Sequence, residues 1–540
     1  MFGKKSKLNP QKLVRDILPP ASVILILAAI VIYTLFFLNH LMHSDMAAEV
    51  ILSKLLRDEG RLITDSWYYS TEIRIIYSHL IMTPLFYIFS DYHTVKVISI
   101  FIFLILLFLA FRFIAGKLQL QHAAFFTALL MLVAPWSNEY LDMMFLGNFY
   151  TSQTICMYIF IAAVIAGAGV MRNEKSAGSG SGQKKRTPKE WIALLEPYVL
   201  AVFSVLLGLS GMRYLACLFA PLLLALGLMY LEGEKSFISS AIRMLIYTCS
   251  SFAGFLIHKF YLSTHYSFDD TSSLDFLPLS EVPDRFMKAL SQMIEFFGYR
   301  DGVSVTSPLG LVNVIRFFFF MALIYMVARL FKDRRSLSLR ERLLLYYFGF
   351  HFVINLYILI FTDVLMQYRY WIPVYIILIL LVGIYVQKYL TGSSAAGMLL
   401  MLFLCFSALS SLYGELWQDV KFDDCKKREG YMAFLEKEGY DFGYATFWNG
   451  PVTEYLSNGK IQVGDFTADD QGNIVPYEWL TRKAYYKKGY HEGKTFLLLA
   501  RTEEAGMLNG EYSVMEDPKK VYEDEYYSVY EGKGMSLFSK

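Results

Sequence analysis

The sequence predicts an α-helical polytopic membrane protein with a small α+β domain at its C-terminal end. Three observations support this prediction. Of the 540 residues, 55% are hydrophobic and only 18% are charged, whereas charged residues make up about a quarter of a soluble domain. The mean hydropathy is +0.39. Long apolar runs fill the chain up to about residue 413, and a hydrophilic tail follows. These features exclude a soluble globule, and the net charge of +2 gives no indication of nucleic-acid binding.

Apolar segments of about 20 residues can cross a bilayer as helices, and about eleven are predicted. They lie near residues 17–39, 95–115, 121–137, 149–171, 192–209, 213–231, 242–262, 309–330, 343–362, 369–389 and 396–413. The apolar stretch 79–89 is too short to span and is expected to form an interfacial or re-entrant helix. The predicted organisation is a basic N-terminus (1–16), a transmembrane domain (17–413) and a soluble domain (414–540).

The distribution of Lys and Arg predicts the orientation of the spans. Three segments are basic: the N-terminus and the loops 172–189 and 332–342. They fall on one side of the membrane if the eleven spans alternate. This side is therefore expected to be cytoplasmic. The first loop (40–94), the acidic loop 263–308 and the C-terminal domain are then extracytoplasmic. We expect a multi-pass protein of the plasma (cytoplasmic) membrane.

The hydrophilic tail has its own secondary-structure pattern. Residues 424–439 indicate a helix, and residues 444–448, 460–463 and 495–500 indicate strands. Asn458-Gly459 is a strong hairpin-turn signal.

The first predicted outer loop carries a carboxylate, Asp45, shortly after the first span, in the run His43-Ser-Asp45. Residues 46–59 have the apolar periodicity of an amphipathic helix, and Asp45 and Glu49 share another of its faces. A carboxylate at a membrane surface is costly unless it is solvated or used. Ser44 or Asp45 could instead cap the helix, and the two roles are compatible.

Aromatic and acidic residues in the outer loops are further candidates. Trp67, Tyr68 and Tyr69 suit either an interfacial belt or a platform for a sugar ring. Glu139 and Asp142, in a short outer loop, either face the same cavity as Asp45 or are ordinary solvated carboxylates.

Two arginines, Arg213 and Arg369, lie at the outer ends of predicted spans. A guanidinium there can bind a phosphate through two parallel hydrogen bonds, or it can extend toward lipid headgroups. The sequence contains no phosphate-binding glycine loop, no dinucleotide-binding glycine fingerprint, no H-E-x-x-H pair and no nucleophile elbow. An enzyme of this sequence would therefore rely on carboxylates and arginines, and on a divalent metal ion if one binds.

Taken together, these motifs resemble those of the GT-C glycosyltransferases, polytopic enzymes that use polyprenyl-phosphate sugars. The likeness is to the protein-mannosyltransferase and aminoarabinose-transferase branch. It is carried by His43-Ser-Asp45 after the first span, Trp67 to Glu72, the Pro84 helix, Pro135 to Asp142 and Arg369-Tyr-Trp-Ile-Pro373. Two features depart from the family pattern. A His-Pro-Pro-Leu block is reduced to His79 and Pro84, and Asp45 has no adjacent acid, which leaves metal dependence open.

The resemblance implies an inverting transfer to an extracytoplasmic acceptor, which could be a lipid, a polymer or a protein. Asp45 would be the general base. Arg369 and Arg213 would stabilise the departing lipid phosphate. Glu139, Asp142 and Glu49 would orient the acceptor or hold a cation. The cavity for sugar and acceptor would be lined by His43, Trp67, Tyr68, Glu72 and His79. The implied partners are the lipid-linked sugar, the acceptor and membrane lipids.

Two other functions remain open. A transporter or flippase of lipid-linked sugars would carry broken or charged helices at mid-bilayer, which the sequence does not indicate. A non-enzymatic membrane protein could use its outer domain to bind a partner.

Overall fold

The computed structural model describes residues 10–174, 188–268, 275–390, 394–417, 424–469, 474–508 and 516–533. Its contacts divide the chain into two compact units. The first unit comprises residues 1–32, 103–256 and 273–419, and the second comprises residues 33–102, 257–272 and 420–540.

Apolar helices account for most of the first unit. Among the described residues of the whole chain, seven helices are long and apolar enough to cross a membrane, or eight if a bent pair forms one span, and three shorter apolar helices accompany them. These segments coincide with the predicted spans. The helices concerned are α2 (Leu18–Phe37), α5 (Tyr92–Lys117), α6 (His122–Val133), α8 (Thr151–Glu174), α9 (Pro188–Gly208), α10 (Ala220–Leu231), α11 (Ile238–Ile257), α14 (Pro308–Lys332), α15 (Leu339–Phe361), α16 (Ile372–Tyr385) and α17 (Ala395–Ser411).

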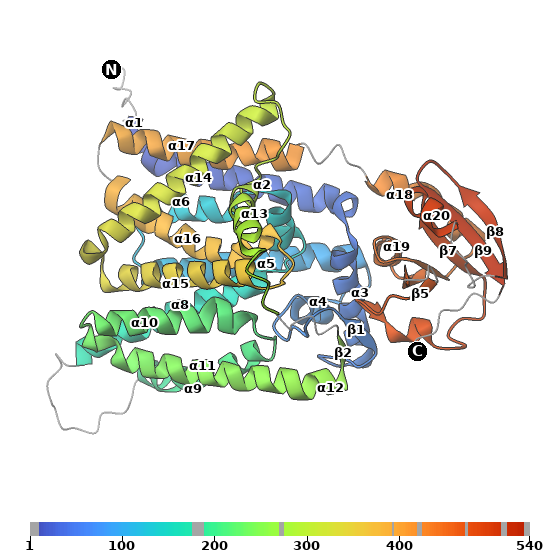
Figure 1. The fold of residues 1–540 in the computed structure, drawn as a ribbon, viewed down its shortest axis with the longest axis horizontal. Coiled ribbons are helices and arrows are strands. Elements are labelled where there is room, and N and C mark those ends of the chain that lie inside the picture. Colours follow the sequence, from blue (N-terminus) through green and yellow to red (C-terminus); the bar gives the residue numbers. More distant parts are fainter. Residues whose placement is uncertain are drawn as a thin grey trace, which may run out of the picture. The chain divides into compact units, whose positions relative to one another are not determined.

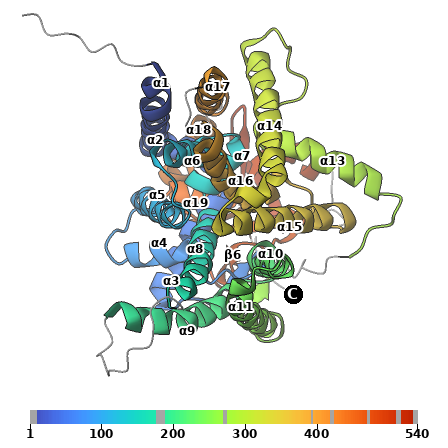
Figure 2. The ribbon, with the colours of Figure 1, turned by 90° about the vertical axis from the view of Figure 1, so that its left-hand side faces the viewer.

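The centre of the first unit is α16, which packs against α6, α14 and α15. In Figure 1 helices α10, α11, α15 and α17 run in roughly the same direction, as in a membrane-spanning bundle. Figure 2 looks toward the helix ends and shows α16 among its neighbours. Two short helices, α7 (Asn138–Leu141) and α13 (Val282–Glu295), lie in loops of this unit.

The second unit contains two helices, α3 and α4, that are not spans. The predicted amphipathic helix is α3 (Ser44–Glu59), and the short predicted helix is α4 (His79–Leu85). The apolar stripe of α3 is buried because α3 packs against both α4 and α19 (Gly450–Leu456). The capping interpretation of Ser44 and Asp45 was wrong: His43 occupies the N-cap position without a side-chain capping bond, and both residues lie in the first turn.

Two β-sheets complete the second unit. The smaller sheet has the order β2-β1-β6 and joins β1 (Trp67–Tyr69) to β2 (Ser267–Phe268) and to β6 (Thr481–Arg482). The larger sheet has the order β5-β4-β3-β7-β9-β8. Its strands are β3 (Phe442–Thr446), β4 (Gln462–Ala468), β5 (Ile474–Pro476), β7 (Thr495–Ala500), β8 (Glu516–Glu523) and β9 (Tyr527–Lys533). Two further helices, α18 (Asp424–Glu438) and α20 (Arg501–Leu508), accompany it (Figure 1).

Side chains of the larger sheet alternate between two cores, as the two-residue repeat of a strand requires. Leu497 and Leu499 join one cluster, whereas Phe496 and Leu498 join the other. The hairpin predicted at Asn458-Gly459 was wrong. Both residues have positive φ, of 56° and 73°, but they follow helix α19, and β4 pairs with β3 in parallel. The turn therefore closes a βαβ unit.

Candidate functional site

The predicted base, Asp45, lies half-buried in the first turn of α3. One helical turn later Glu49 is buried, and its Oε2 accepts a hydrogen bond of 2.9 Å from the Ser78 hydroxyl. Burial raises the pKa of Glu49 to about 7, and the negative charge of Asp45 adds to the shift, while Arg74, Ser78 and Lys96 oppose it. Glu49 is therefore poised to exchange a proton near neutral pH.

A small cavity of about 20 Å³ adjoins Glu49, which is room for about one water molecule. Glu72 and His79 also line it, as do Arg74 and Tyr77. Burial lowers the pKa of His79 to about 4, so the imidazole is neutral at neutral pH. The structure thus brings together three of the predicted residues, Glu49, Glu72 and His79, but the cavity does not have the volume of a sugar ring.

Arg74 was missed as a site residue. Its Nε donates to Glu72 at 3.0 Å and its Nη1 donates to the Tyr77 hydroxyl at 2.7 Å. Buried Lys96 contributes a second positive charge near Glu49. Lys96 could have been identified from the sequence, because it is a lone charge at the start of an apolar span and such a charge needs a partner.

Trp67 and Tyr68 lie in a different setting from the one that either prediction envisaged. Both belong to β1, which pairs with β6. Trp67 is only 1% exposed. The Tyr68 hydroxyl donates to Glu478 at 2.9 Å, and the Lys483 ammonium lies 5.1 Å from the Tyr68 ring centre. Neither ring therefore has an open face here for a sugar or for lipid headgroups. His43, the N-cap residue of α3, is half-buried.

The predicted phosphate ligand Arg369 lies beside an acidic residue of the first unit. Its Nε is 3.7 Å from Glu139 Oε1, in a pair of partly exposed side chains. The Tyr368 hydroxyl also bonds to Glu139. Glu139 belongs to α7, whose N-terminus is capped by Ser137, and Asp142 lies close enough for its charge to act on Glu139. Glu139, Asp142 and Arg369 thus form one polar cluster.

Arg213 makes a separate contact with the same loop. Its guanidinium carbon lies 5.4 Å from the centre of the Tyr150 ring. The Tyr150 amide donates to the Met143 carbonyl at 2.9 Å, which ties the end of the loop to the helical turn after Asp142. Both predicted phosphate-binding arginines therefore contact segment 139–150 at different points.

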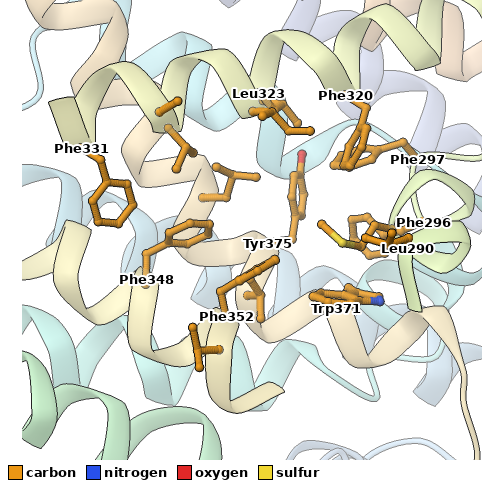
Figure 3. A pocket seen from close by; sticks show the side chains of 18 residues that line it. Leu290, Phe296, Phe297, Phe320, Leu323, Phe331, Phe348, Phe352, Trp371 and Tyr375 are labelled. Atoms are coloured by element: carbon orange, nitrogen blue, oxygen red, sulfur yellow. The ribbon is translucent and has the colours of Figure 1, made fainter. Parts of the chain in front are cut away.

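A wide apolar groove of about 610 Å³ lies among α13, α14, α15 and α16. Figure 3 shows aromatic side chains around it, including Phe297, Phe320 and Phe352. It presents no polar surface. Trp371, two residues after Arg369, forms part of its lining, so the polar cluster and the groove are close along the chain (Figure 3).

Sequence reasoning also missed an ionic triad in the first unit, two members of which, Arg316 and Glu415, are buried. Arg316 Nη2 lies 2.5 Å from Glu415 Oε1, and Arg300 Nη2 lies 2.9 Å from Glu415 Oε2. A Cβ at Gly298 or Gly414 would lie under 3.0 Å from the Arg316 guanidinium, so two glycines leave space for it. The signal was Arg316 itself, a charge inside the predicted span 309–330. Within the described residues, no group of three or more His, Cys, Asp or Glu is placed to hold a metal ion.

Comparison with known proteins adds one finding. No protein-family model and no curated protein matches the chain. Among solved structures, the chain is similar to the crystal structure of ArnT from Cupriavidus metallidurans bound to undecaprenyl phosphate. The TM-score is 0.54 and the identity is 10%, and the likeness covers 96% of this chain and 99% of that chain.

The chain has the fold of a GT-C glycosyltransferase. At this level of identity the likeness concerns the fold. It confirms the predicted architecture, a multi-pass helical membrane protein with an additional C-terminal β-sheet region.

Proposed function

We propose that this GT-C-like protein transfers a sugar from a polyprenyl-phosphate donor to an extracytoplasmic acceptor, with inversion at the anomeric carbon. The observation that carries the proposal is the likeness over the whole chain to ArnT, whose structure contains undecaprenyl phosphate. A lipid-linked donor also fits a protein whose polar cluster of Glu139, Asp142 and Arg369 lies at the ends of apolar helices.

The reaction requires a base that takes up a proton and a positively charged group that stabilises the negative charge of the departing phosphate. The acceptor oxygen or nitrogen attacks the anomeric carbon, the carbon–oxygen bond to phosphate breaks, and its electron pair leaves with the phosphate. Asp45 takes the acceptor proton. Its place in the first turn of α3 suits a carboxylate, because the helix N-terminus carries partial positive charge. Glu49, one turn further and buried, would act on the acceptor site through its electrostatic interaction with Asp45.

Arg369 would bind the donor phosphate. Its guanidinium can donate two hydrogen bonds to phosphate oxygens and stabilise the charge that grows on them in the transition state. The carboxylate of Glu139, with Oε1 3.7 Å from Arg369 Nε, would orient the Arg369 side chain through this ion pair before the donor binds. Arg213 is a second candidate for phosphate contact, and Asp142 is a second candidate for orienting the acceptor or a cation.

The apolar groove suits the polyprenyl chain. Along α14 its lining extends from Phe320 to Phe331, which is about 16 Å at the rise of an α-helix. Covering a surface with a hydrocarbon chain is favourable when the surface is apolar, because polar groups that are covered lose their hydrogen bonds to water. The groove meets that condition, since it presents no polar surface, and Trp371 connects it to the Arg369 segment.

The test is sugar release or transfer from a panel of radiolabelled polyprenyl-phosphate sugars in membranes that contain the protein. Wild type is expected to turn over at least one donor. Asp45→Asn should reduce that turnover by roughly 10²- to 10⁴-fold, the usual contribution of a general base. Asp65→Asn is the matched control, because Asp65 is in the same loop, is largely exposed and forms its ion pair with nearby Arg61.

Two outcomes would count against the proposal. Equal turnover by wild type and Asp45→Asn would remove Asp45 as the base. Failure of wild type to bind or turn over any donor of the panel would contradict the glycosyltransferase assignment itself.

A further inference from the structure

The larger sheet of the second unit contains a feature that commonly marks a ligand site. Strands β3 and β7 are adjacent and parallel. From the carboxyl end of β3 the chain continues through α19 to β4, on one side of β3. From the carboxyl end of β7 it enters α20, and the next strand, β8, lies on the other side. In open α/β sheets, ligands bind where neighbouring connections leave in opposite directions.

Polar side chains from both connections meet at this point. The hydroxyl of Thr446, the last residue of β3, donates to Glu503 Oε1 at 2.8 Å. Asn449 Nδ2 donates to the Thr446 oxygen at 3.0 Å. Glu503 Oε2 also accepts from the Ala500 amide at 2.9 Å. The carboxylate, the amide and the hydroxyl are therefore held in fixed positions, as recognition of a polar ligand requires.

An exposed aromatic residue, Trp448, lies between Thr446 and Asn449 along the chain. Trp448 is 65% exposed, although its neighbours Phe447 and Asn449 are 7% and 5% exposed. Gly450 allows the loop after Trp448 to lie close to β4, since a Cβ there would lie 2.1 Å from Asp465 Oδ1. An exposed indole on an otherwise well-packed loop suits a binding role, because tryptophan is enriched at sites that carry binding energy.

The chemistry of the cluster indicates the class of ligand. A flat ring can stack against the apolar face of a pyranose, while the carboxylate of Glu503, held in place by Thr446 and Asn449, can bind its hydroxyl groups. The carboxylate of Glu503 disfavours phosphates and acidic sugars. Arg501, the basic residue nearest to it along the chain, is already paired with Glu504 and Glu523.

We propose that the carboxyl edge of β3 and β7, formed by Thr446, Trp448, Asn449 and Glu503, is a binding site for a neutral or amine-bearing saccharide. The inference stands apart from the proposed transfer reaction, because it rests on the topology and contacts of the C-terminal sheet alone. It assigns the C-terminal region a role in binding a glycan.

The test is a fluorescence titration of the full-length protein in nanodiscs with chitohexaose, maltohexaose and mannohexaose. At least one of them is expected to change the tryptophan emission on binding. Trp448→Ala should weaken its affinity by roughly tenfold or more, measured by calorimetry, as truncation of a tryptophan anchor does. Trp448→Phe should lose less, because it keeps a ring, and Glu503→Gln should also weaken binding.

The matched control is Tyr490→Ala. Tyr490 is 38% exposed and contacts Phe442, the first residue of β3, so it lies at the opposite edge of the sheet. Its removal should leave saccharide affinity unchanged, as should Asp45→Asn, which separates this site from the transfer reaction. Absence of binding by wild type at millimolar saccharide, or equal affinity of wild type and Trp448→Ala, would overturn the inference. A preference for an oligogalacturonate over the neutral hexasaccharides would overturn it too.

Discussion

Glu49 Oε2 accepts a 2.9 Å hydrogen bond from the hydroxyl of Ser78, which immediately precedes α4, and this bond links the two helices that follow the first span. A buried carboxyl group in such a position is stable when protonated and costly when ionised. The local stability of the α3–α4 pair should therefore depend on pH, and the sign of this dependence follows from the shift of the pKa.

The first prediction concerns this pH dependence. The pKa of Glu49 is raised from 4.5 to about 7, so its contribution to stability is full below about pH 4.5 and is lost as the pH rises through about 7. The integrated effect is on the order of 3 kcal/mol. In thermal unfolding of the detergent-solubilised protein, the Tm of wild type should fall over this interval relative to that of Glu49→Gln, which cannot ionise.

Parallel pH profiles of wild type and Glu49→Gln would contradict the assignment of a raised pKa to Glu49. Glu59→Gln, on the same helix, provides the control and should follow the wild-type profile.

A second prediction follows from the ionic triad of Glu415 with buried Arg316 and partly exposed Arg300. Glu415 and Arg316 are only 1% and 2% exposed, so removal of the carboxylate leaves a buried guanidinium without its counter-charge. Glu415→Gln should destabilise the protein by about 3–5 kcal/mol. Arg300 is one-third exposed, so Arg300→Gln should cost much less. Differential scanning fluorimetry of both variants measures the difference, and equal Tm values for the two would argue against the burial seen for Arg316.

The sequence predicted the elements whose signal is local. The eleven apolar segments and helix α3 follow from hydropathy and from a repeat of apolar residues, both of which depend on residues close together in the chain. The C-terminal helix 424–439 was predicted for the same reason, and it appears as Asp424–Glu438.

Features that depend on distant residues were not predicted. Glu415 is separated from Arg316 by 99 positions, and nothing in either local sequence indicates the other. The burial of Trp67 depends on β6, which is formed by residues 481 and 482. Asn458-Gly459 supplies positive φ both in hairpins and after helices, so the dipeptide alone could not distinguish a hairpin from a βαβ crossover.

A third prediction tests Arg369 as the phosphate ligand. Arg369→Lys keeps the positive charge but loses the planar fork that binds two phosphate oxygens. Its kcat/KM with the active donor should fall by roughly 10²-fold, as when one transition-state hydrogen bond is removed. Arg329→Lys is the control, since Arg329 pairs with Asp333 at the C-terminal end of α14. Retention of full activity by Arg369→Lys would assign the phosphate contact to another residue.

The fourth prediction tests the groove as the site of the lipid chain. Gly349 lines the groove, and a Cβ there would lie 3.2 Å from the Phe331 ring. Gly349→Phe should therefore fill part of the volume that a long hydrocarbon chain needs. With an undecaprenyl-phosphate sugar, KM should rise by roughly tenfold, equivalent to about 1.4 kcal/mol of lost chain binding, while kcat changes little because the reacting atoms lie elsewhere. With a geranyl-phosphate sugar, whose chain is too short to fill the groove, KM should stay near the wild-type value. Gly227→Phe serves as the control, because a Cβ at that position of α10 meets no atom within 4 Å. An equal rise in KM for both donors would mean that the substitution disturbs the headgroup site, and the groove would then lose its role in binding the chain.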